Sequence, residues 1–133
     1  MTDQVQTHYG GADDLADLIA QSLRASGKNL EALTTSDLST VDEFHIRGRK
    51  ATLELGGHMV LTEESRVLDI GSGLGGPART LAEEYGCHVT GIDLTEAFCE
   101  AARNMSKWVN LDDRVMFQQG DATSLPFEDE QFD

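Results

Sequence analysis

The sequence is poor in several residue types, and each scarcity narrows the classes of protein to which it can belong. Among 133 residues there are 2 cysteines and 2 prolines, and no apolar run approaches the roughly 20 residues of a membrane-spanning helix. Cys87 and Cys99 have no CxxC spacing and no histidine cluster around them, so we expect reduced thiols, no disulfide and no metal site. Because the N-terminus lacks the features of a signal peptide, we expect a cytoplasmic protein that spans no membrane.

Basic residues are also scarce. Ten lysines and arginines stand against 24 acidic residues, which gives a formal net charge of −14. Such a charge repels phosphate backbones and anionic lipid surfaces, and we therefore expect neither nucleic acid nor a membrane as a partner. The acidic residues are scattered along the chain instead of gathered in blocks, which favours a solvated acidic surface over a site for a cationic substrate.

The hydrophobic pattern indicates one globular unit with helices in its first half. Apolar residues at helical spacing predict a helix over residues 13–26, and a less regular pattern interrupted by Gly48 predicts a second over 44–61. We interpret residues 1–65 as an N-terminal helical lid segment and residues 66–133 as a cofactor-binding half-domain.

From residue 66 onward the pattern alternates between short apolar strands and helices. The predicted elements are strand 66–70, helix 77–85, strand 87–93, a helix that follows Thr95, and strand 115–119. This is the βαβαβ half of a doubly wound parallel sheet, with strand order 3-2-1 and right-handed crossovers. The fold class is therefore α/β, Rossmann-like, preceded by N-terminal helices.

A glycine-rich turn follows the first predicted strand and supports two interpretations. Gly71, Gly73 and Gly76 satisfy the dinucleotide fingerprint GxGxxG, which a nicotinamide-dependent oxidoreductase carries at this point. Asp69, two residues before the first glycine, argues for another ligand, because a pyrophosphate would place negative charge beside its carboxylate. S-adenosylmethionine has no phosphate and carries an ammonium and a sulfonium, so an acid beside the turn suits it better.

Two further acids follow the ends of the second and third predicted strands. Ligands of such sheets bind beyond the carboxyl ends of the strands. Asp93 is placed to accept hydrogen bonds from both hydroxyls of a ribose, and Asp121 to accept one from an exocyclic amine such as that of adenine. The backbone N–H of Ala122 is placed to meet a ring nitrogen. These are the roles of a nucleoside site.

Three motifs in this order resemble those of class I S-adenosylmethionine-dependent methyltransferases. They are the stretch 67–76, the segment Gly91-Ile92-Asp93-Leu94, and Gly120-Asp121-Ala122 with the residues up to Asp133. The resemblance covers about half of the chain and implies S-adenosylmethionine as the cofactor. It implies as cofactor-binding residues Asp69, Gly71, Ser72, Gly73, Gly75, Asp93, Leu94, Asp121 and Ala122.

The stretches 41–49 and 73–79 look most like small-molecule methyltransferases, among them the sarcosine and dimethylglycine N-methyltransferases and the quinone-biosynthesis C-methyltransferases. That resemblance implies a small-molecule substrate and places Tyr9, His45 and Arg47, with Phe44, near it. The simpler interpretation, which we favour, makes Phe44 a core residue and places His45, Arg47 and Arg49 on a solvated helix face. We expect Arg79 to pair with a surface acid.

No catalytic residue is assigned from the sequence, because substrate contacts in the resembled family lie in later strands and the sequence ends at Asp133. The fourth strand is expected to begin there, so the first strand, 67–70, is predicted to be a sheet edge. We expect that edge to pair with another chain in a homo-oligomer, to exchange segments, or to be covered by the N-terminal helices. A chain that binds S-adenosylmethionine without turnover is a further alternative to an enzyme.

Overall fold

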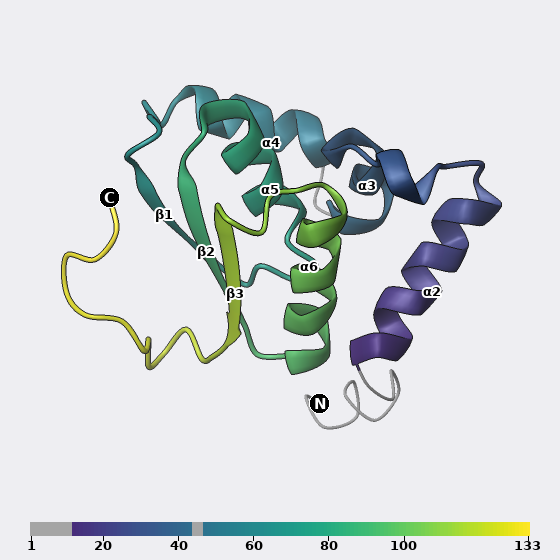
Figure 1. The fold of residues 1–133 in the computed structure, drawn as a ribbon. Helices are drawn as coiled ribbons and strands as arrows, with labels where there is room; N and C mark the ends of the chain where they lie inside the picture. Colours follow the sequence, from purple (N-terminus) through teal and green to yellow (C-terminus); the bar gives the residue numbers. More distant parts are fainter. Residues whose placement is uncertain (1–11, 44–46) are drawn as a thin grey trace.

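A computed structural model describes residues 12–43 and 47–133, and its centre is a three-stranded parallel sheet (Figure 1). The strands are β1 (Arg66–Ile70), β2 (His88–Asp93) and β3 (Val115–Gln119), in the spatial order β1-β2-β3. This confirms the predicted α/β fold and strand order. The register aligns Ile70 with Ile92 and Ile92 with Gln118, so the carboxyl ends of the three strands lie at one edge of the sheet.

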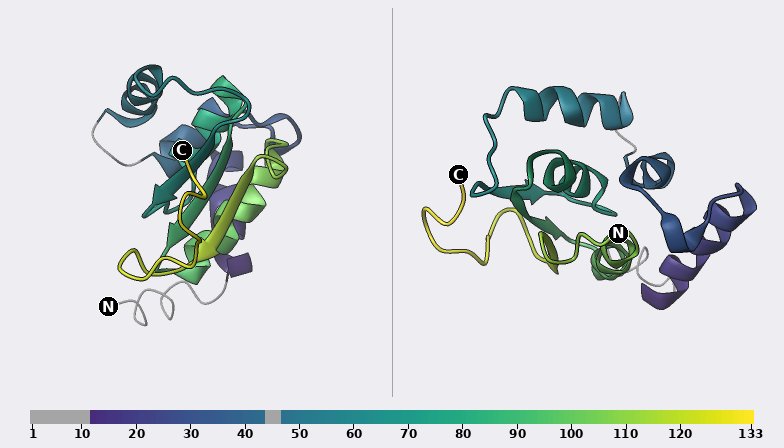
Figure 2. Two further views of the ribbon diagram at one scale, coloured as in Figure 1. Left: turned by 90° about the vertical axis from the view of Figure 1, so that its left-hand side faces the viewer. Right: turned by 45° about the horizontal axis from the view of Figure 1, so that its top comes forward.

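Two helices cover one face of the sheet, α5 (Gly76–Tyr85) and α6 (Glu96–Trp108). The aligned valines of the strands point toward these helices, because side chains alternate between the two faces of a strand. Together they form one core cluster, whose buried members are Ala78, Leu81, Ala82, Cys87, Val89, Cys99, Ala102, Val115 and Phe117. No helix of the described ranges lies on the opposite face, where Ile70 and Met116 are 51% and 66% exposed (Figure 2).

The N-terminal helices pack against the two helices that cover the sheet. They are α2 (Ala12–Ala25), the short 3-10 helix η1 (Leu30–Ala32), α3 (Thr35–Asp42) and α4 (Gly48–Gly57). Helix α2 packs on α6, while α3 and α4 pack on α5. Apolar residues at helical spacing on α2 meet Leu38 of α3 and Met105 of α6 in a second cluster. The N-terminal helices are therefore fixed to the two helices that cover the sheet.

The helix boundaries match the prediction in part. Helix α2 lies within one residue of the predicted range at each end, and α5 ends at Gly86, whose left-handed φ of 70° closes the helix as predicted. Helix α3 was not predicted, although Thr34 and Asp37 form a capping box at its start. Helix α4 occupies only the middle of the predicted range 44–61, of which residues 44–46 lie outside the described residues.

Cys87 and Cys99 are buried free thiols. The prediction that Arg79 pairs with a surface acid is wrong. Arg79 is 1% exposed instead of lying at the surface, and its guanidinium pairs with the equally buried Asp42 at 2.9 Å. The prediction failed because Arg79 lies on the face of α5 that α3 and α6 cover. The spacing of apolar residues along α5 does not show that this face is buried.

The last residues of the chain return to the edge of the sheet beside β1. The N–H of Asp133 donates to the carbonyl oxygen of Arg66, and the N–H of Arg66 donates to Asp133 Oδ2, both at 2.8 Å. The first residue of β1 is thus paired on its outer side. Pairing of the rest of that edge with another chain stays a prediction. Among the described residues no helix is long and apolar enough to cross a membrane.

Candidate functional site

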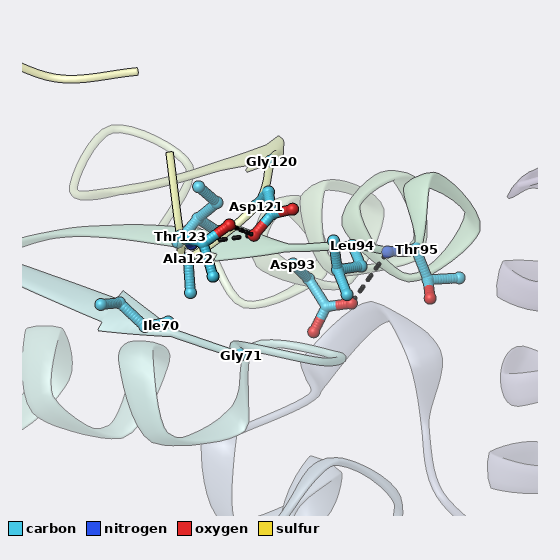
Figure 3. Close-up of a pocket in the computed structure, with 10 residues that line it drawn as sticks. Ile70, Gly71, Asp93, Leu94, Thr95, Gly120, Asp121, Ala122 and Thr123 are labelled. Carbon is cyan, nitrogen blue, oxygen red and sulfur yellow. Dashed lines mark hydrogen bonds between the residues drawn. The ribbon is translucent and has the colours of Figure 1, made fainter. Parts of the chain in front are cut away.

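A pocket of about 530 Å³ opens at the carboxyl ends of the three strands (Figure 3). Its size lies within the range of roughly 300–1,000 Å³ that is usual for small-molecule sites. The position is the one expected for ligands of an open parallel sheet. The pocket is lined by Ile70, Gly71, Ile92, Asp93, Leu94, Thr95, Gly120, Asp121, Ala122 and Thr123.

The glycine turn between β1 and α5 divides into two functional pairs. Gly71 and Gly73 have φ of 76° and 54°, and a Cβ atom added to either would meet nothing within 4 Å. A Cβ on Gly75 would lie 2.8 Å from Cε1 of Phe117, and one on Gly76 would lie 2.6 Å from Cγ of Glu43. The first pair faces open space, which leaves the backbone accessible to a ligand. In the second pair the absence of a side chain allows Phe117 and the end of α3 to pack closely against the turn.

Asp93 at the end of β2 is oriented by two backbone donors. Its Oδ2 accepts a hydrogen bond from the N–H of Gly73 at 2.9 Å, and its Oδ1 accepts one from the N–H of Thr95 at 3.0 Å (Figure 3 shows the second). Each carboxylate oxygen can accept more than one hydrogen bond, so Asp93 keeps acceptor capacity toward the pocket. The same side chain therefore fixes the glycine turn and presents a negative charge to a ligand.

Asp121, just beyond β3, presents a second carboxylate to the same pocket. Its Oδ1 accepts from the backbone N–H and the hydroxyl of Thr123 at 2.8 and 2.7 Å. These hydrogen bonds hold the pKa of Asp121 below its ordinary value, so the group is ionised at neutral pH. The lining residues include two acids and no lysine or arginine. The site is therefore suited to hydroxyls, amines or cations and unsuited to phosphates.

The structure brings together five of the nine residues that the family resemblance implied, namely Gly71, Asp93, Leu94, Asp121 and Ala122. The other four lie around this pocket without lining it. Gly73 lines a neighbouring pocket of about 440 Å³ that α2 helps to form, and Asp69 lines one of about 320 Å³ beneath α4. Ser72 is buried close to Gly91, and Gly75 lies against Phe117.

Of the residues implied to lie near a substrate, Tyr9, His45 and Phe44 lie outside the described residues. Arg47 stands at the start of α4, where its Nη1 donates to Oε2 of Glu54 at 2.7 Å, and it lines none of these three pockets.

Sequence reasoning missed five residues that line the main pocket, which are Ile70, Ile92, Thr95, Gly120 and Thr123. Each of them is next in the sequence to one of the nine residues that the resemblance implied. Their position at the strand ends was a sufficient signal to include them, because a strand's last residues and the turn after it border the same cleft.

Comparison with known proteins gives a family match. The family described as "Methyltransferase domain" matches residues 67–133. The glycine/sarcosine/dimethylglycine N-methyltransferase of Actinopolyspora halophila is 33% identical over 97 residues, which are 73% of this chain and 16% of that protein. The 27-O-demethylrifamycin SV methyltransferase of Amycolatopsis mediterranei is 38% identical over 124 residues, which are 92% of this chain and 43% of that protein.

A solved structure gives the same result. A SAM-dependent methyltransferase from Thiobacillus denitrificans, in complex with S-adenosyl-L-homocysteine, superimposes with a TM-score of 0.58 at 31% identity, covering 76% of this chain and 42% of that one. This chain spans less than half the length of each of these three proteins. The family match, which covers half of the chain, agrees with the strand order, the glycine turn and the acid-lined pocket, and the chain belongs to the class I S-adenosylmethionine-dependent methyltransferase domains.

Proposed function

We propose that this chain binds S-adenosylmethionine in the pocket at the carboxyl ends of β1, β2 and β3, and supplies the cofactor-binding part of a small-molecule methyltransferase. One observation carries the proposal. Asp93 and Asp121, from adjacent strand ends, face one pocket beside a glycine turn whose first two glycines border open space. That arrangement fits a nucleoside with a cationic tail.

Each lining group has a role in this proposal. Asp93 accepts hydrogen bonds from the ribose hydroxyls, and Asp121 accepts one from the adenine amine, with the N–H of Ala122 at a ring nitrogen. The side chain of Leu94, which is 53% exposed without a ligand, covers a face of the adenine ring. The backbone of Gly71 lets the ligand approach closely.

The dinucleotide alternative is disfavoured by what lies at the start of α5. In dinucleotide sites a pyrophosphate binds at the N-terminus of this helix. Here the acidic end of α3 packs against the first residue of that helix, since a Cβ on Gly76 would lie 2.5 Å from Oδ1 of Asp42 and 2.6 Å from Cγ of Glu43. The pocket is lined by two carboxylates and by no lysine or arginine, so it is a poor site for phosphate.

Methyl transfer requires little chemistry from the protein. When bound, S-adenosylmethionine supplies a methyl carbon whose bond to sulfur breaks, with the electron pair passing to sulfur, as the acceptor's nitrogen or carbon forms its new bond. The chain's own residues orient the nucleoside and exclude water from it. Among the residues that line this pocket, only the carboxylates of Asp93 and Asp121 could remove a proton from the acceptor.

The small-molecule acceptor is supported by the relatives and by the charge of the chain. The names of the two curated relatives refer to glycine, sarcosine, dimethylglycine and a rifamycin. A net charge of −14 opposes binding to nucleic acid. We assign residues 1–65 to a lid on the acceptor side, because Leu15, Leu18 and Ile19 of α2 share a pocket with Gly73 of the turn.

Isothermal titration calorimetry with S-adenosylhomocysteine, S-adenosylmethionine and NAD tests the proposal. We expect the first two to bind and NAD to give no heat. The Asp93→Ala variant should bind S-adenosylhomocysteine more weakly by about 1.5–3 kcal/mol, the contribution of a charged hydrogen-bond acceptor. Asp112→Ala removes an exposed acid outside the pocket and is the matched control.

Three outcomes would contradict the proposal. Binding of NAD without S-adenosylhomocysteine would identify a dinucleotide domain. An unchanged dissociation constant in a folded Asp93→Ala variant would remove Asp93 from the site. Cofactor binding without methyl transfer to any amine, carbon or hydroxyl acceptor, in a protein that includes the residues of its longer relatives, would favour a binding module without turnover.

A further inference from the structure

We infer that Arg79 is a positioning residue of the cofactor site. Its side chain holds the glycine turn in the conformation that binds the cofactor, and this conformation therefore depends on the docking of helix α3. The inference rests on the proposed function, because the turn is taken to be part of the cofactor site. Arg79 itself lines none of the three pockets and touches no proposed ligand position.

The guanidinium of Arg79 joins three separate parts of the chain. Its Nη1 donates to the carbonyl oxygen of Ala102 at 3.0 Å and to Oγ of Ser106 at 3.1 Å, both on α6. Its Nη2 donates to Oδ2 of Asp42 at the end of α3, at 2.9 Å, and to the carbonyl oxygen of Leu74 in the glycine turn. Because the five N–H groups of arginine are held in a rigid plane, these contacts fix one another's positions.

The turn is consequently held from both sides at adjacent residues. The N–H of Gly73 is bound by the carboxylate of Asp93, on the side of the pocket, and the carbonyl of Leu74 is bound by Arg79, on the side of the helices. Gly71, Gly73 and Gly75 all have positive φ, so this backbone has more conformations available than an ordinary turn. Two charged side chains select one of those conformations.

Helix α3 supplies the counter-ion on which the arrangement depends. The side chains of Arg79 and Asp42 are 1% and 2% exposed, so neither charge is solvated. Removal of one partner from a buried pair leaves an uncompensated charge, which forces local rearrangement. Because the same nitrogen of Arg79 binds both Asp42 and Leu74, displacement of α3 moves the group that holds the turn.

A core ion pair without influence on the site is the competing explanation, and two variants separate the explanations. Arg79→Lys keeps the positive charge but replaces the planar guanidinium with a single ammonium group. The ammonium cannot reach Asp42, Leu74 and α6 at the same time. Arg114→Lys is the matched control, because Arg114 also donates to a backbone carbonyl, that of Gly86, and lies just before β3, at the end of the sheet opposite the turn.

Two measurements are needed on each variant, under conditions where urea titration shows it to be fully folded. The dissociation constant of S-adenosylhomocysteine should rise about tenfold or more in Arg79→Lys, because hydrogen bonds from a charged donor are lost. In Arg114→Lys it should stay within about twofold. Without ligand, amide hydrogen exchange at Gly75, whose N–H donates to the carbonyl oxygen of Ser72 at 2.9 Å, should accelerate about tenfold in Arg79→Lys. Exchange at Val89 in the sheet is the internal reference.

Unchanged affinity and unchanged exchange at Gly75 in Arg79→Lys would overturn the inference and leave Arg79 as a core residue. If the wild type binds no S-adenosylhomocysteine, the proposed function fails, and the exchange measurement still decides whether Arg79 holds the turn. If Arg79→Lys does not fold, Ser106→Ala removes one anchor of the guanidinium without changing a charge. It should weaken binding about threefold, and an unchanged affinity there would also contradict the inference.

Discussion

The substitution Gly76→Ala tests whether the last glycine of the motif serves packing instead of ligand binding. Gly76 is the first residue of α5 and has no positive φ, so alanine is compatible with its backbone. An alanine in a helix is ordinarily more stable than a glycine by roughly 0.5–1 kcal/mol. The added Cβ, however, would lie 2.5 Å from Oδ1 of Asp42 and 2.6 Å from Cγ of Glu43, about 1 Å closer than carbon atoms normally approach.

The expected loss of stability follows from what must move. The main chain of α3 lies against the added atom as well, so the end of that helix has to be displaced. Overpacking of this kind costs about 1–3 kcal/mol, and displacement of Asp42 also weakens its buried pair with Arg79, whose rupture costs about 3–5 kcal/mol. After subtraction of the helix gain, we expect the free energy of unfolding to fall by roughly 2–4 kcal/mol.

Urea unfolding followed by circular dichroism measures this change, and Gly57→Ala is the matched control. Gly57 ends α4, has no positive φ, and a Cβ there would meet nothing within 4 Å. The control should be unchanged or more stable by up to about 1 kcal/mol. A Gly76→Ala variant as stable as the wild type would refute the assignment of this glycine to helix packing, and with it the close docking of α3.

Three further predictions concern the turn, the buried pair and the sheet edge. Gly73→Val should abolish binding of S-adenosylhomocysteine while most of the helical circular dichroism signal remains, because its branched side chain would enter open space at a φ of 54°; retained binding would make the turn purely structural. Burial outweighs the attraction of Arg79 and raises the pKa of Asp42 to about 6, so the folded state binds a proton that the unfolded chain has released. The stability that this group contributes is therefore present at low pH and lost as pH rises through 6. The difference in unfolding free energy, wild type minus Asp42→Asn, should fall by roughly 1 kcal/mol between pH 5 and pH 7. A rise of this difference would show that the pKa of Asp42 is lowered instead. Sedimentation velocity at several concentrations should show self-association of this 133-residue chain through the outer edge of β1, and methyl transfer should be absent; a stable, active monomer would contradict both expectations.

The sheet and its covering helices were predictable because their signals are local. Short apolar runs, together with the glycines that follow β1, β3 and α5, located β1 to β3 and α5 to within one or two residues. Strand order followed from the rule that parallel crossovers are right-handed and adjacent. The glycine turn and the two strand-end acids followed in turn, because parallel strands present their carboxyl ends at one edge.

Features that depend on contacts across the sequence were not predictable. Arg79 and Asp42 are 37 residues apart, and nothing local to either marks it as buried. The short α3 was missed although Thr34 and Asp37 form a capping box, because its few apolar residues give a weak helical pattern. Likewise, the motif did not reveal that Gly75 and Gly76 have a different task from Gly71 and Gly73, since that depends on which side chains lie behind the turn.

The division of the glycine motif explains how one sequence pattern can match two cofactor classes. Both classes need an open backbone after the first strand, which Gly71 and Gly73 provide. They differ in what lies at the start of the next helix, where a dinucleotide site leaves room for pyrophosphate. In this chain the acidic end of α3 packs against Gly76, the first residue of that helix, and Arg79 ties it to the turn. We therefore expect the discrimination between cofactors to depend on α3, which precedes the motif, and a test of cofactor preference has to include the N-terminal residues together with the glycine turn.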